Sequence, residues 1–250
     1  MIAISDLKIM GIIGARSGSR GVPHKNIRSL AGKPLIGWII ETAKKSKYIN
    51  RVVVSTDLEE YAAIARAHGA DVPYLRPKEL AEDKSPEYDY VRHMVEWLEK
   101  NEGYRPDIVV RMMATVPLQA TGDIDAAIEE LLKDPKTHSA VVIAEARQHP
   151  LKALKLVDDG KGGKKLVTYF TESGREVTPI ARQNYEKAYF RANVIACRTA
   201  VIFGTNSLTG DQVRYHIIPQ ERAIDIDNPV DFFIVEKLME TFDNKDTPRR

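Results

Sequence analysis

A polar run near the N-terminus combines glycines with basic side chains in a way that suits anion binding. The run GARSGSRGVPHKN spans residues 14–26 and directly follows the mostly apolar stretch 7–13. Glycine lets backbone N–H groups approach a phosphate closely, and Arg16, Arg20 and Lys25 could neutralise phosphate oxygens. The run lacks the Gly-Lys-Ser/Thr ending of a P-loop and the glycine spacing of a Rossmann dinucleotide loop. It therefore indicates a phosphate-binding loop of another kind, with a solvated basic turn as the alternative.

Two carboxylates near the C-terminus form a second candidate site. Asp225 and Asp227 flank a single isoleucine, so on an extended strand both side chains would point to the same face. Close like charges are costly unless a cation stabilises them, and hard oxygen ligands suit Mg²⁺, especially when substrate phosphates complete its shell. The alternative is structural, because Asp227 or Asn228 could cap a helix that begins at Pro229. Both interpretations fit the pattern.

Three further motifs carry weaker signals. Arg76 and the acidic stretch 79–83 could border a base-binding pocket or form a polar loop. Lys152 offers a cation within a His-Pro-Leu-Lys motif that also fits a surface turn. Asn193 follows an arginine on an expected strand, where a buried amide would need hydrogen-bond partners.

The elements that must hold these residues alternate between buried-strand and helix patterns. Three consecutive valines at 52–54 suit a sheet covered on both faces, and the helix pattern at 58–68 follows Asp57, a suitable N-cap. Such alternation is typical of βαβ units, so we expect an α/β fold with a mostly parallel central sheet flanked by helices. Ligands of such sheets collect at the carboxyl ends of strands, where the run 14–26 begins. We expect strands at 7–13, 51–56, 107–113, 139–144, 190–197 and 213–218, and helices at 34–47, 58–68, 86–100, 121–132 and 229–241.

The alternation breaks between residues 147 and 189. Three glycines at 160–163 and several isolated aromatic residues indicate short strands and loops, with no crossover helix. We therefore expect an α/β domain formed by residues 1–146 and 190–245, with 147–189 as a small inserted subdomain.

Composition narrows the possible classes of partner. The 250 residues include 37 basic and 35 acidic side chains, a net charge of +2, which does not suggest a nucleic-acid-binding protein. The single cysteine, Cys197, excludes an intramolecular disulfide. No apolar run is long enough for a signal peptide or a membrane span, so we expect a cytoplasmic protein without a membrane partner.

Taken together, the motifs resemble a known family. In chain order they are Ala-Arg-x-Gly-Ser-Arg-Gly-x-Pro-x-Lys-Asn, Val-Ser-Thr-Asp, Leu-Arg-Pro-x-Glu-Leu, Thr-x-Pro-Leu, His-Pro-Leu-Lys, Phe-Arg-x-Asn and Ile-Asp-Ile-Asp. This constellation resembles the CMP-N-acylneuraminate (CMP-sialic acid) synthetases and their relatives that act on other nonulosonic acids. The resemblance runs from about residue 9 to residue 238.

The resemblance implies a Rossmann-like nucleotidyltransferase that works as a homodimer. Such an enzyme joins CTP to a 2-keto-3-deoxy sugar acid, gives a CMP-sugar and pyrophosphate, and requires Mg²⁺. It also implies that the segment 147–189 supplies the dimer contacts, and that the partners are CTP and a sialic-acid-like sugar acid.

The resemblance further assigns roles to individual residues. Arg16 and Lys25 would bind the CTP phosphates, and Asp225 and Asp227 would bind Mg²⁺, with Asp225 also close to the attacking hydroxyl; Arg16, Lys25 and Asp225 are thus the catalytic candidates. The implied nucleotide-binding residues are Arg16, Ser17, Gly18, Ser19, Arg20, Gly21, Lys25, Asn26, Arg76 and Ser85, with Arg76 and the backbone near Ser85 at the cytosine. The implied sugar-side residues are Met113, Lys152, Arg182 and Asn193, with Lys152 and Arg182 reaching across the dimer interface.

Departures from the family pattern concentrate on the sugar side. Where the family commonly reads Leu-Gln-Pro-Thr-Ser-Pro-Leu-Arg, this chain has Met113 at the glutamine position. The family often ends its Phe-Arg-Pro-Asn-Gly strand with a tyrosine, and that position is Cys197 in this chain. A thioether cannot replace the hydrogen bonds of an amide, and one such bond can decide specificity. We therefore expect a legionaminic, pseudaminic or other modified sugar acid at least as readily as N-acetylneuraminate. The alternatives are a related nucleotidyltransferase with a phosphonate or sugar phosphate acceptor, and a non-catalytic nucleotide-binding scaffold.

Overall fold

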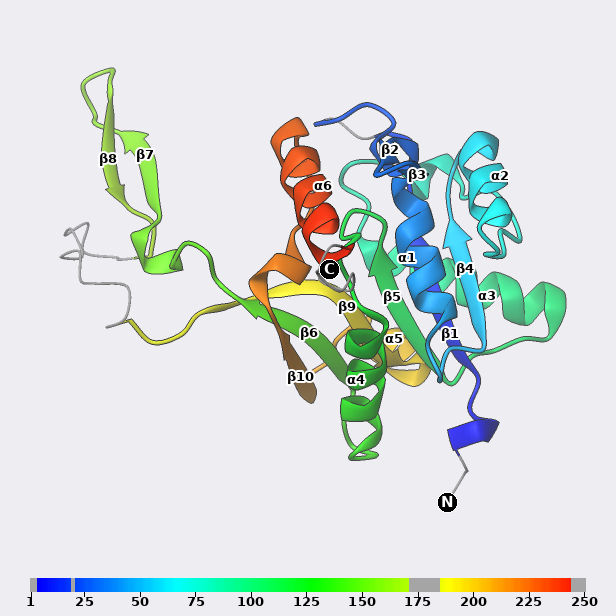
Figure 1. Cartoon of the computed structure of the whole chain (residues 1–250). Coiled ribbons are helices and arrows are strands. Elements are labelled where there is room, and N and C mark those ends of the chain that lie inside the picture. Colours follow the sequence, from blue (N-terminus) through cyan, green and yellow to red (C-terminus); the bar gives the residue numbers. More distant parts are fainter. Residues whose placement is uncertain (1–3, 19–20, 171–184, 244–250) are drawn as a thin grey trace, which may run out of the picture.

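The computed structural model describes residues 4–18, 21–170 and 185–243 and contains a six-stranded central sheet (Figure 1). Its strand order is β10-β6-β9-β5-β1-β4, and β9 runs antiparallel to both of its neighbours, whereas all other pairs are parallel. The prediction of a mostly parallel sheet is thus confirmed. The strands are β1 (Ile9–Gly14), β4 (Arg51–Ser55), β5 (Ile108–Met113), β6 (Ser139–Glu145), β9 (Tyr189–Arg198) and β10 (Val213–Ile218).

Helices cover both faces of this sheet because its central strands alternate buried apolar side chains to either side. Ile9 and Ile13 of β1 pack into one core with the inward faces of α1, α2 and α4. Met10 and Ile12 point the other way, into a core shared with α3 and α5. The helices are α1 (Leu35–Lys44), α2 (Glu59–Ala67), α3 (Glu87–Glu102), α4 (Thr121–Leu132), α5 (Thr199–Thr205) and α6 (Pro229–Asp243).

A third apolar cluster brings the C-terminal segment back to the loop that follows β1. Ile224 and Ile226 pack with Val235 of α6 against Leu30 and Leu35. The two isoleucines that alternate with the aspartates are therefore anchors, since they turn inward and leave the carboxylates to the outside. Short elements complete this region and the loops: β2 (Ser29–Leu30), β3 (Lys33–Pro34), and the 3-10 turns η1 (Ile4–Asp6), η2 (Lys25–Ile27), η3 (Lys78–Leu80), η4 (Pro150–Lys152) and η6 (Gln220–Ala223).

Two local predictions differ from the structure. The N-cap of α2 is Leu58, and Asp57 instead accepts hydrogen bonds from the backbone N–H and the hydroxyl of Ser17. The prediction of Asp57 as a helix cap was therefore wrong, because a tertiary contact takes its carboxylate. Sequence patterning also missed α5, which has only seven residues and follows β9 directly.

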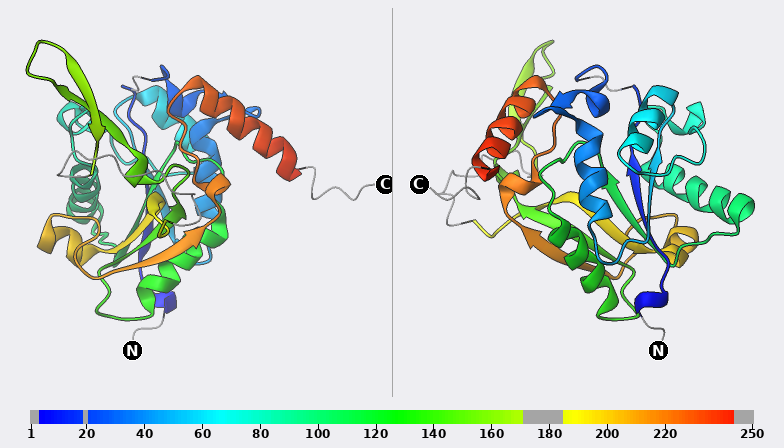
Figure 2. Two further views of the ribbon diagram at one scale, coloured as in Figure 1. Left: turned by 90° about the vertical axis from the view of Figure 1, so that its left-hand side faces the viewer. Right: turned by 45° about the vertical axis from the view of Figure 1, so that its right-hand side comes forward.

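The segment expected as an insertion contains a hairpin that stands apart from the sheet. Strands β7 (Leu154–Asp158) and β8 (Lys164–Thr168) pair antiparallel with each other and form a separate two-stranded sheet. Figure 1 and the left-hand view of Figure 2 show this hairpin projecting away from the helices and the sheet. Within the described ranges, no helix has the length and apolar character needed to span a bilayer.

Burial in the central strand sets a first testable expectation. Replacing Ile12, which is fully buried between β5 and α3, with alanine should lower the free energy of unfolding by about 2–5 kcal/mol, because the remaining cavity cannot fully collapse. Ile217 on the edge strand β10 is 47% exposed, so Ile217→Ala should cost less than about 1 kcal/mol. Urea denaturation of both variants tests this, and equal losses would contradict the assignment of the core.

Candidate active site

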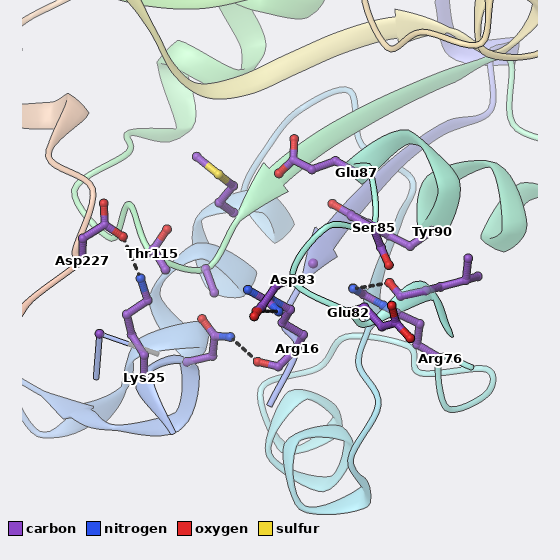
Figure 3. A pocket seen from close by; sticks show the side chains of 16 residues that line it. Arg16, Lys25, Arg76, Glu82, Asp83, Ser85, Glu87, Tyr90, Thr115 and Asp227 are labelled. Atoms are coloured by element: carbon purple, nitrogen blue, oxygen red, sulfur yellow. Dashed lines mark hydrogen bonds and ion pairs between the residues drawn. The ribbon is translucent and has the colours of Figure 1, made fainter. Parts of the chain in front are cut away.

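A cleft of about 400 Å³ opens where β1 and β5 end (Figure 3). Gly14 is the last residue of β1 and Met113 the last of β5, so the cleft lies at the carboxyl edge of the parallel strands, as expected for this fold. Its wall is formed by Gly14, Arg16, Gly21, Lys25 and Asn26 after β1, by Arg76, Leu80, Glu82, Asp83, Ser85, Glu87 and Tyr90, by Met113, Ala114 and Thr115 after β5, and by Asp227.

The basic loop and the acidic segment meet at one side of this cleft. The Lys25 ammonium donates to the backbone oxygen of Ile226 at 2.5 Å and to Oδ1 of Asp227 at 3.0 Å. Gly21 packs so closely that a β-carbon there would lie 2.3 Å from the backbone oxygen of Asp227. The loop after β5 holds the same segment, since the Ile226 N–H donates to the Thr115 carbonyl at 2.9 Å. Three distant parts of the chain thus converge here.

The two aspartates combine the roles that the sequence left open. Desolvation raises the pKa of Asp225, and the nearby charge of Asp227 adds to this, whereas a hydrogen bond from Thr115 opposes it. Asn228 caps α6, because its side chain accepts from the backbone N–H groups of Val230 and Asp231. The capping alternative therefore falls to Asn228 and leaves the carboxylates of Asp225 and Asp227 for other partners.

This acidic pair fits a divalent cation that a ligand helps to hold. Burial is the main cause that raises the pKa of Asp225, the negative charge of Asp227 adds to it, and Lys25 forms an ion pair with Asp227. Among the residues that the structure describes, no group of three or more His, Cys, Asp or Glu side chains could ligate a metal by itself. Two hard oxygen ligands are what Mg²⁺ commonly takes from a protein when phosphates supply the rest of its shell.

Arg16 lies in the middle of the cleft, paired with a carboxylate. Its Nη1 donates to Oδ1 of Asp83 at 2.5 Å and, more weakly, to the Ala81 carbonyl at 3.4 Å. Asn26 is buried and donates to the Arg16 carbonyl at 2.9 Å, which fixes the backbone of the loop. A guanidinium has five N–H donors, so this pairing leaves Arg16 able to bind an incoming anion.

The other residues of the loop after β1 differ in whether their groups already have hydrogen-bond partners. Ser17 is held by Asp57, with its N–H 2.8 Å and its hydroxyl 2.7 Å from the carboxylate oxygens. Gly18 is exposed, and the expected contributions of Ser19 and Arg20 lie outside the described residues.

Arg76 serves the scaffold on the far side of the cleft. It is buried, donates through Nε and Nη2 to the hydroxyl and carbonyl of Ser55 at 2.9 and 2.6 Å, and lies 4.2 Å over the ring of Tyr90. Burial lowers the pKa of Arg76 and raises that of Tyr90 to about 12. Ser85 donates its hydroxyl to the Glu79 carbonyl at 2.8 Å. These bonds shape a rigid end of the cleft, where Arg76 and Ser85 both line the wall.

The sugar-side residues expected from the sequence are not brought together. Met113 lines the cleft, whereas Asn193 is fully buried behind it and is not part of the wall. The Asn193 side chain accepts from the Met113 N–H and donates to the Met113 carbonyl at 3.3 Å. Lys152 lies in a separate hollow at the base of the hairpin, beside Tyr169 and Phe190, and Arg182 lies outside the described residues.

Sequence reasoning overlooked several cleft residues. Glu87 and Tyr90 occupy the first turn of α3, and their spacing of three places both on the side that faces the cleft. A signal was present in the Ser-Pro pair directly before the helix, which marks a loop end at the site. Thr115 is part of the Thr-x-Pro-Leu motif, which gives no sign of a role for the threonine, and Asp83 is one of several acidic residues in the stretch 79–83.

Comparison with known proteins agrees with this geometry. The family model described as Cytidylyltransferase matches residues 10–227. The chain is 31% identical to the post-translational flagellin modification protein B of Campylobacter coli over 93% of this chain and 95% of that protein. It is 29% identical to the CMP-N,N'-diacetyllegionaminic acid synthase of Legionella pneumophila over 94% of this chain and 97% of that protein. Among solved structures, a CMP:2-keto-3-deoxy-manno-octonic acid synthetase complexed with CTP shares the fold, with a TM-score of 0.67, 18% identity, and coverage of 94% of this chain and 99% of that one.

A cleft at the carboxyl edge of a mostly parallel sheet, lined by a glycine-rich cationic loop, defines a nucleotide-binding α/β protein. With 218 residues matched between positions 10 and 227, the chain belongs to the cytidylyltransferase family.

The position of Asn193 sets a second testable expectation. Replacing it with alanine should lower the free energy of unfolding by about 1–3 kcal/mol, because the part-buried N–H and carbonyl of Met113 both lose the side chain that pairs with them. Asn101→Ala removes an exposed hydrogen bond on α3 and should cost less than about 1 kcal/mol. If Asn193→Ala leaves the urea midpoint unchanged and affects only substrate binding, Asn193 supports no wall and contacts substrate itself.

Proposed function

We propose that this chain transfers a cytidylyl group from CTP to a nonulosonic acid, that is, a sialic-acid-like 2-keto-3-deoxy sugar acid. The observation that carries the proposal is the shared cleft of Arg16, Lys25 and Asp227, which can hold a polyanion and its counterion together. Family membership supports the cytidylyl transfer. The Legionella relative, named as a CMP-N,N'-diacetyllegionaminic acid synthase, supports the acceptor class.

The proposed reaction exchanges one bond to phosphorus for another. The anomeric hydroxyl oxygen of the sugar acid attacks the α-phosphorus of CTP, and the bond from that phosphorus to the oxygen bridging to the β-phosphate breaks. The products are the CMP-sugar and pyrophosphate, and the hydroxyl proton leaves to a carboxylate or to water. Such a transfer depends mainly on positioning and on neutralisation of charge.

The chain's own cations supply much of that neutralisation. Arg16 keeps N–H donors that make no hydrogen bond to the described residues, so triphosphate oxygens can bind them or displace Asp83. Lys25 donates two of its three ammonium N–H groups to Ile226 and Asp227, so the third can bind a phosphate oxygen. Because both groups are already held in place by hydrogen bonds, little reorganisation is needed when the nucleotide binds.

Asp225 and Asp227 are the residues that would hold Mg²⁺. The ion, once bound with the nucleotide, would neutralise phosphate charge that builds up as pyrophosphate leaves. Within the protein, the inward anchors Ile224 and Ile226 orient the carboxylates, and the Thr115 hydrogen bond orients Asp225. We also propose that Asp225 lies next to the attacking hydroxyl.

The proposal extends to assembly and location. A cytoplasmic homodimer would bring Lys152 and Arg182 of one subunit toward the cleft of the other, which accounts for the distance of Lys152 from the cleft in the single chain. The hairpin and the hollow beside it expose Leu154, Leu156, Leu166 and Phe190, a surface suited to a partner.

The activity itself is tested by pyrophosphate release. Wild-type protein with CTP and Mg²⁺ should release pyrophosphate with a sugar acid such as N,N'-diacetyllegionaminic, pseudaminic or N-acetylneuraminic acid. The double variant Asp225→Asn and Asp227→Asn should lose at least about a thousandfold in kcat while its thermal unfolding stays close to that of the wild type. The same assay is run with phosphonate and sugar phosphate acceptors, and a reaction with these alone would contradict the acceptor class. Unchanged turnover in the double variant would contradict the metal role.

The contact between Gly21 and Asp227 gives an independent test of the shared cleft. Gly21→Ala should weaken CTP binding at least about tenfold, because a β-carbon 2.3 Å from the Asp227 carbonyl must push the loop and the acidic segment apart. Gly122→Ala in α4, where an added methyl meets nothing within 4 Å, is the matched control and should bind CTP normally. Calorimetric titration with CTP measures the affinity of both variants. Normal binding by Gly21→Ala would contradict a CTP site formed jointly by the loop after β1 and the acidic segment.

A further inference from the structure

One ion pair at the cleft wall has no role in the proposed transfer. Nη2 of Arg111 lies 2.7 Å from Oε2 of Glu87. The Arg111 side chain is only 8% exposed, whereas that of Glu87 is 48% exposed and lines the cleft. Figure 3 shows Glu87 beside the tip of β5, set apart from the Arg16 and Asp83 pair. A buried cation thus presents a carboxylate to the cleft.

Arg111 joins this carboxylate to the support of the neighbouring wall. Its Nη1 donates to the Asn193 carbonyl at 2.8 Å, and Asn193 holds both backbone polar groups of Met113. Arg111 and Met113 are two residues apart on β5, so their side chains point to the same face of the sheet. Glu87, Arg111, Asn193 and Met113 therefore form one connected network.

Glu87 offers one oxygen to a ligand. Oε2 faces Arg111, whereas Oε1 makes no hydrogen bond to any residue within the described part of the chain. An ionised carboxylate only accepts hydrogen bonds, so a fixed Glu87 selects for an N–H or O–H group on whatever occupies the cleft. The adjacent Met113 side chain cannot provide such a contact, so Glu87 is the carboxylate acceptor beside it.

We propose that Glu87, positioned by Arg111, is a specificity-determining residue that accepts a hydrogen bond from a donor group of the substrate. This inference rests on the proposed function and adds to it the recognition of a hydrogen-bond donor on the substrate. The donor has two possible sources with the same chemistry, the exocyclic amine of cytosine or a hydroxyl or acylamino N–H of the sugar acid. A site built around such a bond rejects an analogue that lacks the donor.

Glu87→Gln tests the polarity of the contact with little change in shape. The glutamine carbonyl can still accept from Arg111, while its amide nitrogen replaces the free oxygen and turns an acceptor into a donor. Glu96→Gln is the matched control on the same helix, since Glu96 pairs with Arg92 on the exposed side and lies outside the cleft. Thermal unfolding of both variants should match that of the wild type.

Two comparisons separate the sources of the donor. The first is the ratio of affinities for CTP and UTP, because uracil has a carbonyl where cytosine has the amine. The second is the ratio for a sugar acid and its analogues that lack one hydroxyl or one acylamino N–H. Glu87→Gln should reduce one of these ratios at least about tenfold, while Glu96→Gln changes neither. A change of less than about twofold in both ratios would overturn the proposal.

The positioning role of Arg111 is tested by a second variant. Arg111→Met should lose most of the same selectivity, and adding Glu87→Gln to it should have little further effect, because the two residues act as a unit. Additive losses would show that Glu87 acts without Arg111. Both ratios are measured by equilibrium binding as well as by turnover. A wild-type protein that binds but does not turn over would contradict the proposed function and still leave the Glu87 test decisive.

Discussion

The contact between Lys25 and the acidic segment is the interaction on which the site depends. Lys25 belongs to the loop after the first strand, and its two acceptors lie about two hundred residues later in the chain. Its ammonium neutralises Asp227, and Gly21 packs so closely against the Asp227 backbone that a β-carbon at this position would clash with it. Without this bridge the cationic loop and the carboxylates would be separate surface features.

Ion pairs carry most of the charge balance around the cleft. Three cations at or behind the wall pair with a carboxylate, Arg16 with Asp83, Lys25 with Asp227 and Arg111 with Glu87, whereas Arg76 donates to Ser55. The first two pairs are accessible enough for a polyanion to compete for the cation, because ion pairs in contact with water are individually weak. The Arg111 cation is buried, so its carboxylate stays in place and faces the ligand. The two accessible ion pairs can therefore exchange their carboxylate for a ligand phosphate, whereas the Arg111–Glu87 pair stays intact and presents its carboxylate to the ligand.

The fold was largely predictable, because its signals are local and periodic. The run of valines at 52–54 identifies a buried strand, the pattern at 213–218 identifies a further strand, and the alternation with helices gives the layered α/β class. The antiparallel direction of β9 was not predictable, since direction depends on where the chain returns after the hairpin. Asp57 shows a second limit, because a residue suited to cap a helix was taken by Ser17 from another loop.

The site was predictable in its charged parts and not in its supports. Lys25 and Asp227 stand out by residue type, whereas the burial of Asn193 behind Met113 follows only from three-dimensional packing. Arg111 and Glu87 come from a strand and a helix whose patterns otherwise read as ordinary core and surface.

Strand β9 also gives the molecule a direct structural link. It starts at Tyr189, paired with Glu145 at the end of β6, and four residues later it reaches Asn193 behind the cleft. Phe190 of the same strand lines the hollow at the base of the hairpin, so β9 contributes both to that hollow and to the backing of Met113. A molecule bound in that hollow would therefore contact the strand whose Asn193 holds the far wall of the cleft.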